Sequence, residues 1–378
     1  MTGSTEARAA DDVRWMRRAI ELAESGRGLT SPNPMVGAVV VKDGRSLGEG
    51  FHARAGGLHA EAEALQRAGA AAHGATVYVT LEPCNHRGRT PPCVEAVLAA
   101  GVARVVAAIA DPNPRVTGGG ARALRAAGVD VTMGCLGAEV ARQNRTFFTA
   151  MRRGRPHVTL KCAMTLDGKI AAFDGSARWI TGEDARRLGH RLRSEVDAVV
   201  VGIGTALADN PSLDVRLGDP WPREPFRLVV DSAARLPVTA RLIATGRPVR
   251  AAVAVTDRAP AERVAALEAR GVTVLRCKER QERVDLEDLC AHLFALDVIG
   301  VLLEGGGELN ASFLEAGLVD RVAVFIAPLL LGGATAPTAV GGAGRLLPHA
   351  IALEDMDVRR VGRDWLIEAD IRHAQRGD

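Results

Sequence analysis

Two short segments bring together side chains that could hold a metal ion and move a proton. His59 and Glu61 stand two residues apart in LHAEAEAL, Cys84 follows 25 residues after His59, and eight residues separate Cys84 from Cys93 in TLEPCNHRGRTPPC. One imidazole and two thiolates would leave a zinc ion formally neutral, with a fourth tetrahedral position open for water. Zinc lowers the pKa of such a water to about 7, and a nearby carboxylate can carry protons.

The pattern His-x-Glu followed by Pro-Cys and a second cysteine is the signature of zinc-dependent deaminases, in which the glutamate is not a ligand. That signature has two residues between its cysteines, and this sequence has eight. The prolines before Cys93 and the helical pattern after it predict a helix that begins at Cys93, where the helix dipole stabilises a thiolate. His59 should stand at the entrance of another helix with Glu61 in its first turn, because positions i and i+2 point to different sides of a regular helix.

Each of these residues also has a simpler interpretation. His59 alone would be a surface histidine, and Cys84 and Cys93 could be buried thiols, as we expect for the other four cysteines of this chain. A non-catalytic zinc scaffold is disfavoured by Glu61, because a structural zinc ion has a closed ligand shell. We expect residues 85–92 between the cysteines, with His86 and Arg89, to form part of a substrate pocket wall.

Apolar runs alternate with helical patterns along the whole chain, which predicts an α/β fold. In the first part we expect strands at 36–44, 75–81, 103–111 and 129–133, helices at 11–25 and 137–150, and a hairpin over KDGRSLGEG that makes the sheet mixed. The segment MRRGRP, residues 151–156, is the candidate linker. It divides the chain into domains of residues 1–150 and 151–378. In the second domain we expect strands at 157–164, 197–204, 226–232, 249–255, 272–277, 300–306 and 321–330, and helices at 182–194, 260–270, 285–295 and 308–317.

The second domain carries weaker signals. GGGELNASF places three glycines between a strand and a helix, where backbone N–H groups could hold a phosphate, although the run also suits a tight turn and is not a dinucleotide-binding fingerprint. Arginines recur in RRLGHRLRSEVD, and most of them fit a solvated helix face.

Composition limits the function classes. The 378 residues carry a net charge of +3 and are 47% apolar, so the charge is too mild to favour nucleic acid as a partner. The polar N-terminus has no signal-peptide core, and the apolar run 322–334 is too short and too interrupted to cross a membrane. We therefore expect a cytoplasmic enzyme that acts on a small molecule. Whether it is a monomer or a homo-oligomer stays open.

The segments SPNPMVGAVVVKDG, HAEAEAL and TLEPCNHRGRTPPC resemble the deaminase half of the bifunctional riboflavin-biosynthesis deaminase/reductases, in which the long cysteine gap is the norm. The resemblance implies a cytidine-deaminase-like, three-layer αβα domain with one zinc ion on His59, Cys84 and Cys93 and with Glu61 as the proton shuttle. Asn33 in SPNP would contact the pyrimidine, although a plain Asn-Pro turn is the alternative.

From HVTLKCAMTLDGKIA onward the chain resembles the reductase half of the same family, which is similar to dihydrofolate reductases and uses NADPH. The resemblance implies that Arg193 and Arg216 bind the substrate phosphate, which guanidinium groups suit through paired hydrogen bonds. It implies further substrate contacts at Leu213, Glu304 and Ala177, the last through its backbone because many relatives have a polar residue there. The positions that match cofactor contacts are Ala163, Trp179, Thr205, Asp209, Ser232, Gly306, Gly307, Glu308, Leu309, Asn310, Ala311 and Ser312. Thr205 and Asp209 could instead cap or close a turn.

The expected function is deamination of 2,5-diamino-6-(5-phosphoribosylamino)pyrimidin-4(3H)-one, followed by NADPH-dependent reduction of the ribosyl group to give 5-amino-6-(5-phosphoribitylamino)uracil. A polynucleotide deaminase of the tRNA-editing type, with an accessory nucleotide-binding domain, is the alternative. It would share the zinc site but would need a more basic surface.

Overall fold

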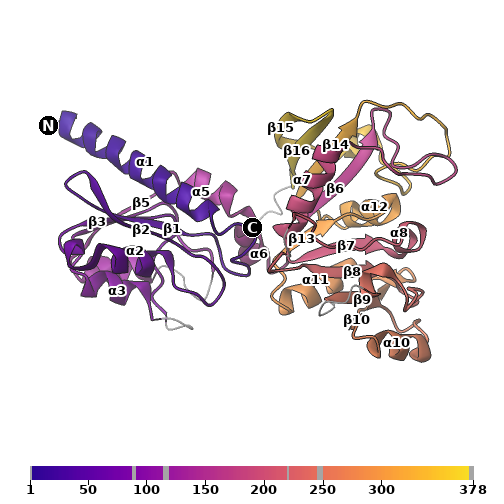
Figure 1. Cartoon of the computed structure of the whole chain (residues 1–378), viewed down its shortest axis with the longest axis horizontal. Helices are drawn as coiled ribbons and strands as arrows, with labels where there is room; N and C mark the ends of the chain where they lie inside the picture. The colour runs from indigo at the N-terminus through magenta and orange to yellow at the C-terminus, as the bar shows by residue number, and fades with distance from the viewer. Residues whose placement is uncertain (1, 87–90, 114–118, 219–220, 245–249, 374–378) are drawn as a thin grey trace. The chain divides into compact units, whose positions relative to one another are not determined.

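The computed structural model divides into two compact units, Met1–Gly154 and Arg155–Asp378 (Figure 1). It describes residues 2–86, 91–113, 119–218, 221–244 and 250–373. The division falls inside the segment that the sequence offered as a linker. The helix α6 (Arg145–Arg153) extends into that segment, so residues 151–153 of the expected linker are helical.

The first unit is built on a five-stranded mixed sheet in the order β2-β1-β3-β4-β5. Its strands are β1 (Gly37–Lys42), β2 (Arg45–Phe51), β3 (Thr76–Val79), β4 (Arg104–Ala107) and β5 (Asp130–Met133). β1 pairs antiparallel with β2 and β3, which confirms the predicted hairpin, and β3, β4 and β5 run parallel.

Helices cover both faces of this sheet, which makes three layers. Alternate residues of a strand point to opposite faces. Ala38 and Val40 pack with α2 (Ala60–Ala68), α3 (Cys93–Ala99) and α4 (Gly120–Ala126), whereas Val39 and Val41 pack with α1 (Thr2–Glu24) and α5 (Gly137–Gln143). Figure 1 shows α1 and α5 on one side and α2 and α3 on the other. A short 3₁₀ turn, η1 (Gly69–Ala72), follows α2.

Two helix predictions for this unit were wrong in their bounds. α1 begins at Thr2, well before the expected residue 11. The helix expected over 137–150 is two helices, α5 and α6, separated at Asn144. The Asn144 amide exchanges two hydrogen bonds with the backbone of Met35, at 2.7 and 2.9 Å, which ties the break to the loop before β1.

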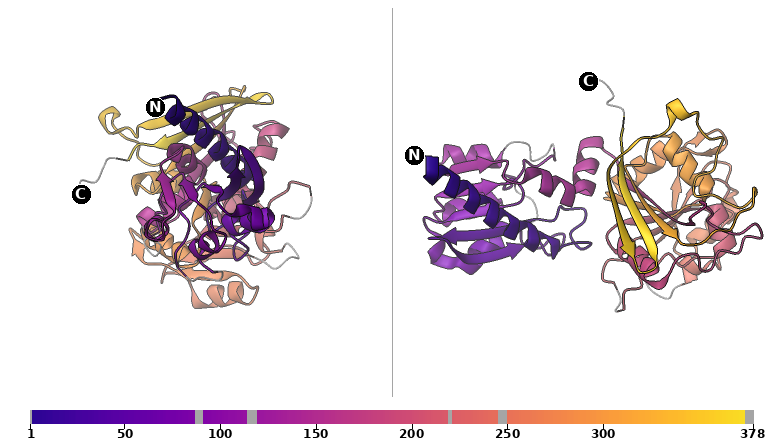
Figure 2. Two further views of the ribbon diagram at one scale, coloured as in Figure 1. Left: turned by 90° about the vertical axis from the view of Figure 1, so that its left-hand side faces the viewer. Right: turned by 90° about the horizontal axis from the view of Figure 1, so that it is seen from above.

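The second unit contains a nine-stranded sheet in the order β10-β9-β8-β7-β13-β6-β14-β16-β15. Neighbours are parallel from β10 to β14, and β16 and β15 add an antiparallel edge (Figure 2). The strands are β6 (His157–Thr165), β7 (Ala198–Gly202), β8 (Phe226–Val230), β9 (Ala251–Val255), β10 (Thr273–Arg276), β13 (Gly300–Leu303), β14 (Arg321–Ala327), β15 (Leu353–Val361) and β16 (Asp364–Ile371). A separate small hairpin joins β11 (Glu279–Arg280) to β12 (Arg283–Val284).

Two groups of helices bury the faces of the larger sheet. One face packs with α11 (Leu286–Ala295) and α12 (Gly307–Glu315), and the other with α7 (Glu183–Ser194), α8 (Ile203–Asp209), α9 (Arg241–Ala244) and α10 (Ala261–Glu268). A 3₁₀ turn, η2 (Leu347–His349), precedes β15. The sequence patterns missed α8, α9 and the β15–β16 hairpin. Within the described ranges, no helix combines the length and apolar character that crossing a membrane requires.

Candidate active sites

The structure gathers His59, Cys84 and Cys93 at the ends of three elements of the first unit. His59 is the N-cap residue of α2, Cys84 follows β3, and Cys93 is the first residue of α3. One coordinating atom from each lies within 4.8 Å of the other two.

The spacing of these atoms fits a zinc ion. His59 Nδ1 lies 3.1 Å from Cys93 Sγ and 3.5 Å from Cys84 Sγ. Tetrahedral zinc with its usual bond lengths places such a nitrogen and sulfur about 3.6 Å apart. The backbone N–H of Cys93 also points to Cys84 Sγ at 3.3 Å. Hydrogen bonds from the Cys93 thiol, His59 and this amide outweigh burial and lower the pKa of Cys84 to about 4, so the thiolate is available for a metal.

Glu61 lies in the first turn of α2 and is buried, with 4% of its surface exposed. Burial disfavours the charged form and raises the pKa of its carboxyl group. A carboxyl group whose pKa is raised holds a proton more readily than a free one, which suits general acid and base work beside the three metal-ligating atoms.

His52 is a residue of this site that the sequence patterns did not single out. Its Nδ1 lies 2.9 Å from the Leu58 carbonyl, so that nitrogen carries the hydrogen, and its Nε2 accepts from the Asn33 amide at 3.1 Å. The bond occupies one side of the Asn33 amide group and turns its carbonyl oxygen away from His52. Only the folded structure reveals the role of His52, because His52 and Asn33 are 19 positions apart in the sequence. The expected pocket wall at residues 85–92 includes 87–90, among them Arg89, which lie outside the described residues.

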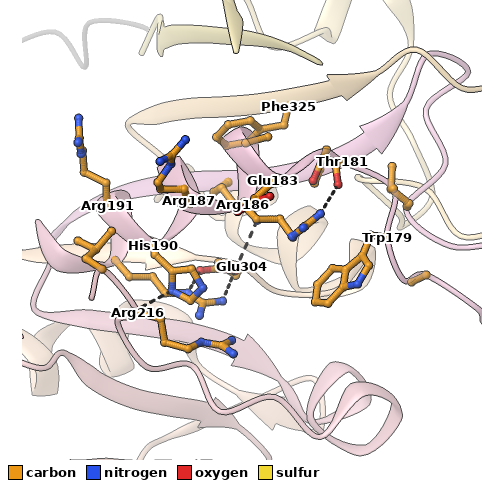
Figure 3. Close-up of a pocket in the computed structure, with 18 of the residues that line it drawn as sticks. Trp179, Thr181, Glu183, Arg186, Arg187, His190, Arg191, Arg216, Glu304 and Phe325 are labelled. Atoms are coloured by element: carbon orange, nitrogen blue, oxygen red, sulfur yellow. Dashed lines mark hydrogen bonds and ion pairs between the residues drawn. The ribbon is translucent and has the colours of Figure 1, made fainter. Parts of the chain in front are cut away.

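The second unit contains a cavity of about 870 Å³ that is rich in positive charge. β6, the segment 170–181, α7 and the segment 216–218 form its walls (Figure 3). Ligand pockets commonly measure about 300–1,000 Å³. Its arginines and lysine are Lys161, Arg186, Arg187, Arg191, Arg193 and Arg216, against the acidic residues Glu183 and Glu304. Size and charge therefore fit phosphorylated ligands, including a dinucleotide.

Six of the residues named from the sequence line this cavity: Ala163, Ala177, Trp179, Arg193, Arg216 and Glu304. Trp179 is 65% exposed, and the guanidinium carbon of Arg186 lies over its ring, 4.6 Å from the ring centroid.

Arg193 and Glu304 form a buried ion pair in the cavity wall. Nε and Nη2 of Arg193 donate to the two carboxylate oxygens of Glu304 at 2.6 and 3.0 Å, and Nη1 donates to the Asp214 carbonyl at 3.1 Å. Lys161 Nζ lies 3.6 Å from the same carboxylate. Burial alone would raise the pKa of Glu304, but the charges of Arg193 and Lys161 outweigh it and lower the pKa to about 2. Sequence patterns missed Lys161 because its isolated position on β6 has no motif.

Arg216 and His190 form a more open part of the wall. The Arg216 side chain is 59% exposed and its Nε lies 3.4 Å from Asp214. His190 Nδ1 lies 3.2 Å from the backbone nitrogen of Arg216 and 3.2 Å from the carbonyl oxygen of Asp214. Burial, Arg193 and Arg216 together lower the pKa of His190.

The other named residues do not line the cavity. Leu213 is 2% exposed and packs in the core, and Ser232 Oγ accepts from the Val284 amide at 3.1 Å. Thr205 and Asp209 lie on α8, where the sequence patterns predicted the end of a strand at residue 204 and offered a cap or turn for these two residues. The segment 306–312 begins α12, with Gly306 as its N-cap residue.

The glycine run before α12 reflects close packing. A Cβ atom on Gly306 would stand 3.0 Å from Thr205 Oγ1, and one on Gly307 would stand 2.6 Å from the Thr338 carbonyl oxygen. Gly306 has φ −68°, an ordinary value for any residue, so close approach of neighbouring atoms is what requires glycine here.

Comparisons with known proteins match both units. The family model "Cytidine and deoxycytidylate deaminase zinc-binding region" matches residues 9–109, and "RibD C-terminal domain" matches residues 156–367. The riboflavin biosynthesis protein RibD of Actinobacillus pleuropneumoniae is 43% identical over 97% of this chain and 96% of its own, and that of Escherichia coli is 40% identical over 93% and 97%.

Solved structures agree. Acinetobacter baumannii RibD has a TM-score of 0.87 at 37% identity and covers 97% of this chain and 100% of its own. A diaminohydroxyphosphoribosylaminopyrimidine deaminase/5-amino-6-(5-phosphoribosylamino)uracil reductase from Thermotoga maritima has a TM-score of 0.83 at 34% identity, with the same coverage of both chains.

A deaminase-type metal site on a three-layer domain, followed by a reductase domain, defines a bifunctional deaminase and reductase. The chain belongs to the RibD family of riboflavin biosynthesis proteins. The predicted fold class and the predicted pair of activities are confirmed, and the polynucleotide-deaminase alternative is not favoured.

Proposed function

We propose that the first unit removes the 2-amino group of 2,5-diamino-6-(5-phosphoribosylamino)pyrimidin-4(3H)-one by hydrolysis, and that the second unit then reduces the ribosyl group with NADPH. The observation that carries this proposal is the meeting of His59, Cys84 and Cys93 beside the buried Glu61. The charged cavity of the second unit supports the reductive half.

In the deaminase half, His59, Cys84 and Cys93 would hold one zinc ion, which would supply an activated water at neutral pH. Glu61 would pass one proton from the attacking water to the pyrimidine ring, and would then pass the second proton of that water, from the hydroxyl group it leaves on the ring, to the departing ammonia. Asn33, fixed by His52, positions the pyrimidine through its amide oxygen. Both residues reach the same end of the sheet from loops outside the metal-ligating segments.

In the reductase half, the cavity would hold NADPH, whose chemistry would be hydride donation to C1′ of the ribosylamine. The C1′–O4′ bond breaks as the sugar opens, so O4′ must gain a proton, and the overall reaction consumes one proton. Lys161 faces the cavity beside Glu304 and is placed to donate it. Replacing Lys161 by methionine should lower kcat more than it raises KM; an unchanged kcat would exclude Lys161 as the donor.

The substrate phosphate is bound by Arg216 and Arg193. A guanidinium group has five N–H donors. Arg193 directs one donor to the Asp214 carbonyl and two to Glu304, so two remain to meet phosphate oxygens in the cavity. Arg216 is more exposed, and the His190 ring lines the same cavity.

NADPH would use Ala163 and Trp179 in the cavity wall and Thr205, Asp209, Ser232 and residues 306–312 beyond it. Ala177 would contact substrate at the cavity wall, and Leu213, whose side chain is buried, would do so through its backbone. As in other nicotinamide enzymes, the cofactor carries the chemistry and the protein sets its position.

A direct assay tests the proposal. Purified chain should release ammonia from the diaminopyrimidine phosphate and oxidise NADPH only after that release. An RNA stem-loop with a target base in its loop is the comparison substrate. Deamination of the RNA without deamination of the pyrimidine would overturn the assignment.

Two further features bear on where and how the enzyme works. All six cysteines are free, which suits the reducing cytoplasm.

We also propose a homo-oligomer through the edge strand β15, where Leu353, Met356 and Val358 are 44%, 65% and 48% exposed. Exposed sheet edges are templates for pairing with another chain. Light scattering should give a mass above one chain, and a fall to one chain in Met356→Lys; a wild-type monomer would refute this.

A further inference from the structure

A second group of metal-ligating side chains lies in the reductase unit, and no step of the proposed function uses it. Cys277 Sγ, a carboxylate oxygen of Asp288 and a ring nitrogen of His292 all lie within 4.8 Å of one another. His292 Nε2 is 3.4 Å from Asp288 Oδ2. Zinc-bound nitrogen and oxygen atoms lie about 3.3 Å apart at usual bond lengths, so this pair already stands at ligand spacing.

The three residues come from two elements, the end of β10 and the helix α11. Cys277 directly follows β10, and its backbone N–H donates to the Val255 carbonyl at 2.8 Å, which fixes its position on the sheet. Asp288 and His292 lie four residues apart on α11, so their side chains are neighbours on one helix face. Asp285 caps α11 through the N–H groups of Glu287 and Asp288, which fixes the helix start.

The donor set selects the kind of ion. A thiolate, an imidazole and a carboxylate are ligands of zinc and similar transition metals, whereas magnesium and calcium take oxygen ligands. Across the part of the chain that the structure describes, the only other such group is His59, Cys84 and Cys93, the deaminase set. Both groups contain cysteine and histidine donors.

Exposure gives an ion access from one side. Cys277 is 6% exposed, the Asp288 side chain is 16% exposed, and the His292 side chain is 44% exposed. The open position of a three-ligand site therefore falls on the solvent side, where water can occupy it.

The charges around the group allow an ion to bind. Asp288 Oδ2 accepts from the Lys278 backbone N–H at 2.9 Å, and the Lys278 ammonium lies 3.3 Å from Oδ1. The Lys278 side chain is 81% exposed, so its ammonium group can move into solvent when a cation takes its place. The Asp285 carboxylate lies 2.9 Å from Arg280 Nε and accepts from the first N–H groups of α11. It is therefore already engaged and is not counted as a ligand of the ion.

We propose that Cys277, Asp288 and His292 form a second transition-metal site of the zinc class in the reductase unit, with water in its open position. Binding forms a metal–sulfur bond and releases the Cys277 thiol proton to solvent, with no change of oxidation state. The ion joins the end of β10 to α11 and closes the loop that holds β11 and β12. From that loop Val284 donates its N–H to Ser232 Oγ, so the ion stiffens the support of a proposed cofactor residue.

The test is a metal titration of the full chain after removal of bound metal with a chelator. Wild-type chain should bind two equivalents of Zn²⁺, and Cys277→Ala should bind one. Cys290→Ala is the matched control, because Cys290 is equally buried in the same core cluster but lies outside the group, and it should bind two. One equivalent in the wild type, or equal stoichiometry in the two cysteine variants, would overturn the proposal.

A second variant keeps the test informative if Cys277→Ala does not fold. The His292 side chain is 44% exposed and lies outside the core, so His292→Ala should fold as the wild type does and still lose the second equivalent. Co²⁺ titration adds a spectroscopic readout: the thiolate-to-cobalt absorption should be weaker in Cys277→Ala than in Cys290→Ala. Excess Zn²⁺ should raise the Tm of the wild type and of Cys290→Ala but not that of His292→Ala; the same rise in all three would contradict a site at His292.

Discussion

At the scale of single residues, Arg193 and Arg216 carry similar charges but sit in different surroundings. The Arg193 side chain is 15% exposed and paired with Glu304, whereas that of Arg216 is 59% exposed. Removing one partner of a buried pair leaves an uncompensated charge and costs about 3–5 kcal/mol. An exposed pair contributes about 0–1 kcal/mol.

The two arginines should therefore separate binding from stability. Arg216→Ala should raise the reductase KM for the phosphorylated substrate at least about tenfold, since a charge-assisted hydrogen bond contributes about 1.5–3 kcal/mol, with little change in the free energy of unfolding. Arg193→Ala should raise KM and also destabilise the unit. Steady-state kinetics and urea unfolding measure both quantities. Equal KM in wild type and Arg216→Ala would remove Arg216 from the phosphate site.

Glu304 should make the stability of the reductase unit depend on pH. Its pKa falls from 4.5 to about 2 on folding, so the ionised carboxylate stabilises the folded state above pH 4.5. That stability is lost as the pH falls from 4.5 through about 2. The shift corresponds to about 3 kcal/mol at pH 7 and about 1 kcal/mol at pH 3.

Urea unfolding of wild type and Glu304→Gln at the two pH values measures this contribution. The difference in unfolding free energy should shrink at pH 3 to less than half its value at pH 7. A difference that does not change with pH would mean that the ion pair does not stabilise the fold.

Sequence patterns found residues in local motifs and missed those defined by tertiary contacts. His59, Glu61, Cys84 and Cys93 were named because the chemistry restricts their types and spacing. Lys161 and His52 belong to no short motif, and their roles follow from Glu304 and Asn33, which are distant in sequence.

At the scale of elements, the contact between α2 and β2 sets the position of the zinc site. A Cβ atom on Gly50 would stand 2.5 Å from the Ala60 carbonyl oxygen, so the helix that begins beside His59 lies directly on the strand. The Phe51 N–H also donates to the Glu63 carboxylate at 2.9 Å.

Gly50→Val should push α2 away from the sheet. Overpacking typically costs about 1–3 kcal/mol, and the shift carries His59 and Glu61 with it. We expect less bound zinc and slower ammonia release, with NADPH oxidation on pre-deaminated substrate unchanged. Gln66→Ala, on the exposed face of α2, is the matched control. Normal zinc content in Gly50→Val would show that the helix position tolerates the added side chain.

The errors in the predicted elements have physical causes. The helical pattern over 137–150 continues through Asn144, but hydrogen bonds to Met35 hold Asn144 outside helical geometry. Every residue of β15 but the last is exposed, so it lacks the alternation of buried and exposed positions that marks a strand. The buried parallel strands were predictable because they form continuous apolar runs.

At the scale of the whole molecule, each unit has its own sheet and its own buried clusters, and each set of proposed catalytic groups lies within one unit. The deaminase ligands lie in Met1–Gly154, and the charged cavity lies in Arg155–Asp378. A change confined to one site should therefore spare the other half-reaction. This separation lets one half-reaction serve as the internal control for the other.

The most direct measurement uses Glu61→Gln and wild type, with zinc content, ammonia release and NADPH oxidation determined on one preparation of each. The amide keeps the size of the side chain but cannot carry the proton. Zinc per chain should be equal, ammonia release should fall at least about 100-fold, and NADPH oxidation with pre-deaminated substrate should be unchanged. Undiminished ammonia release, with zinc still bound, would contradict the account.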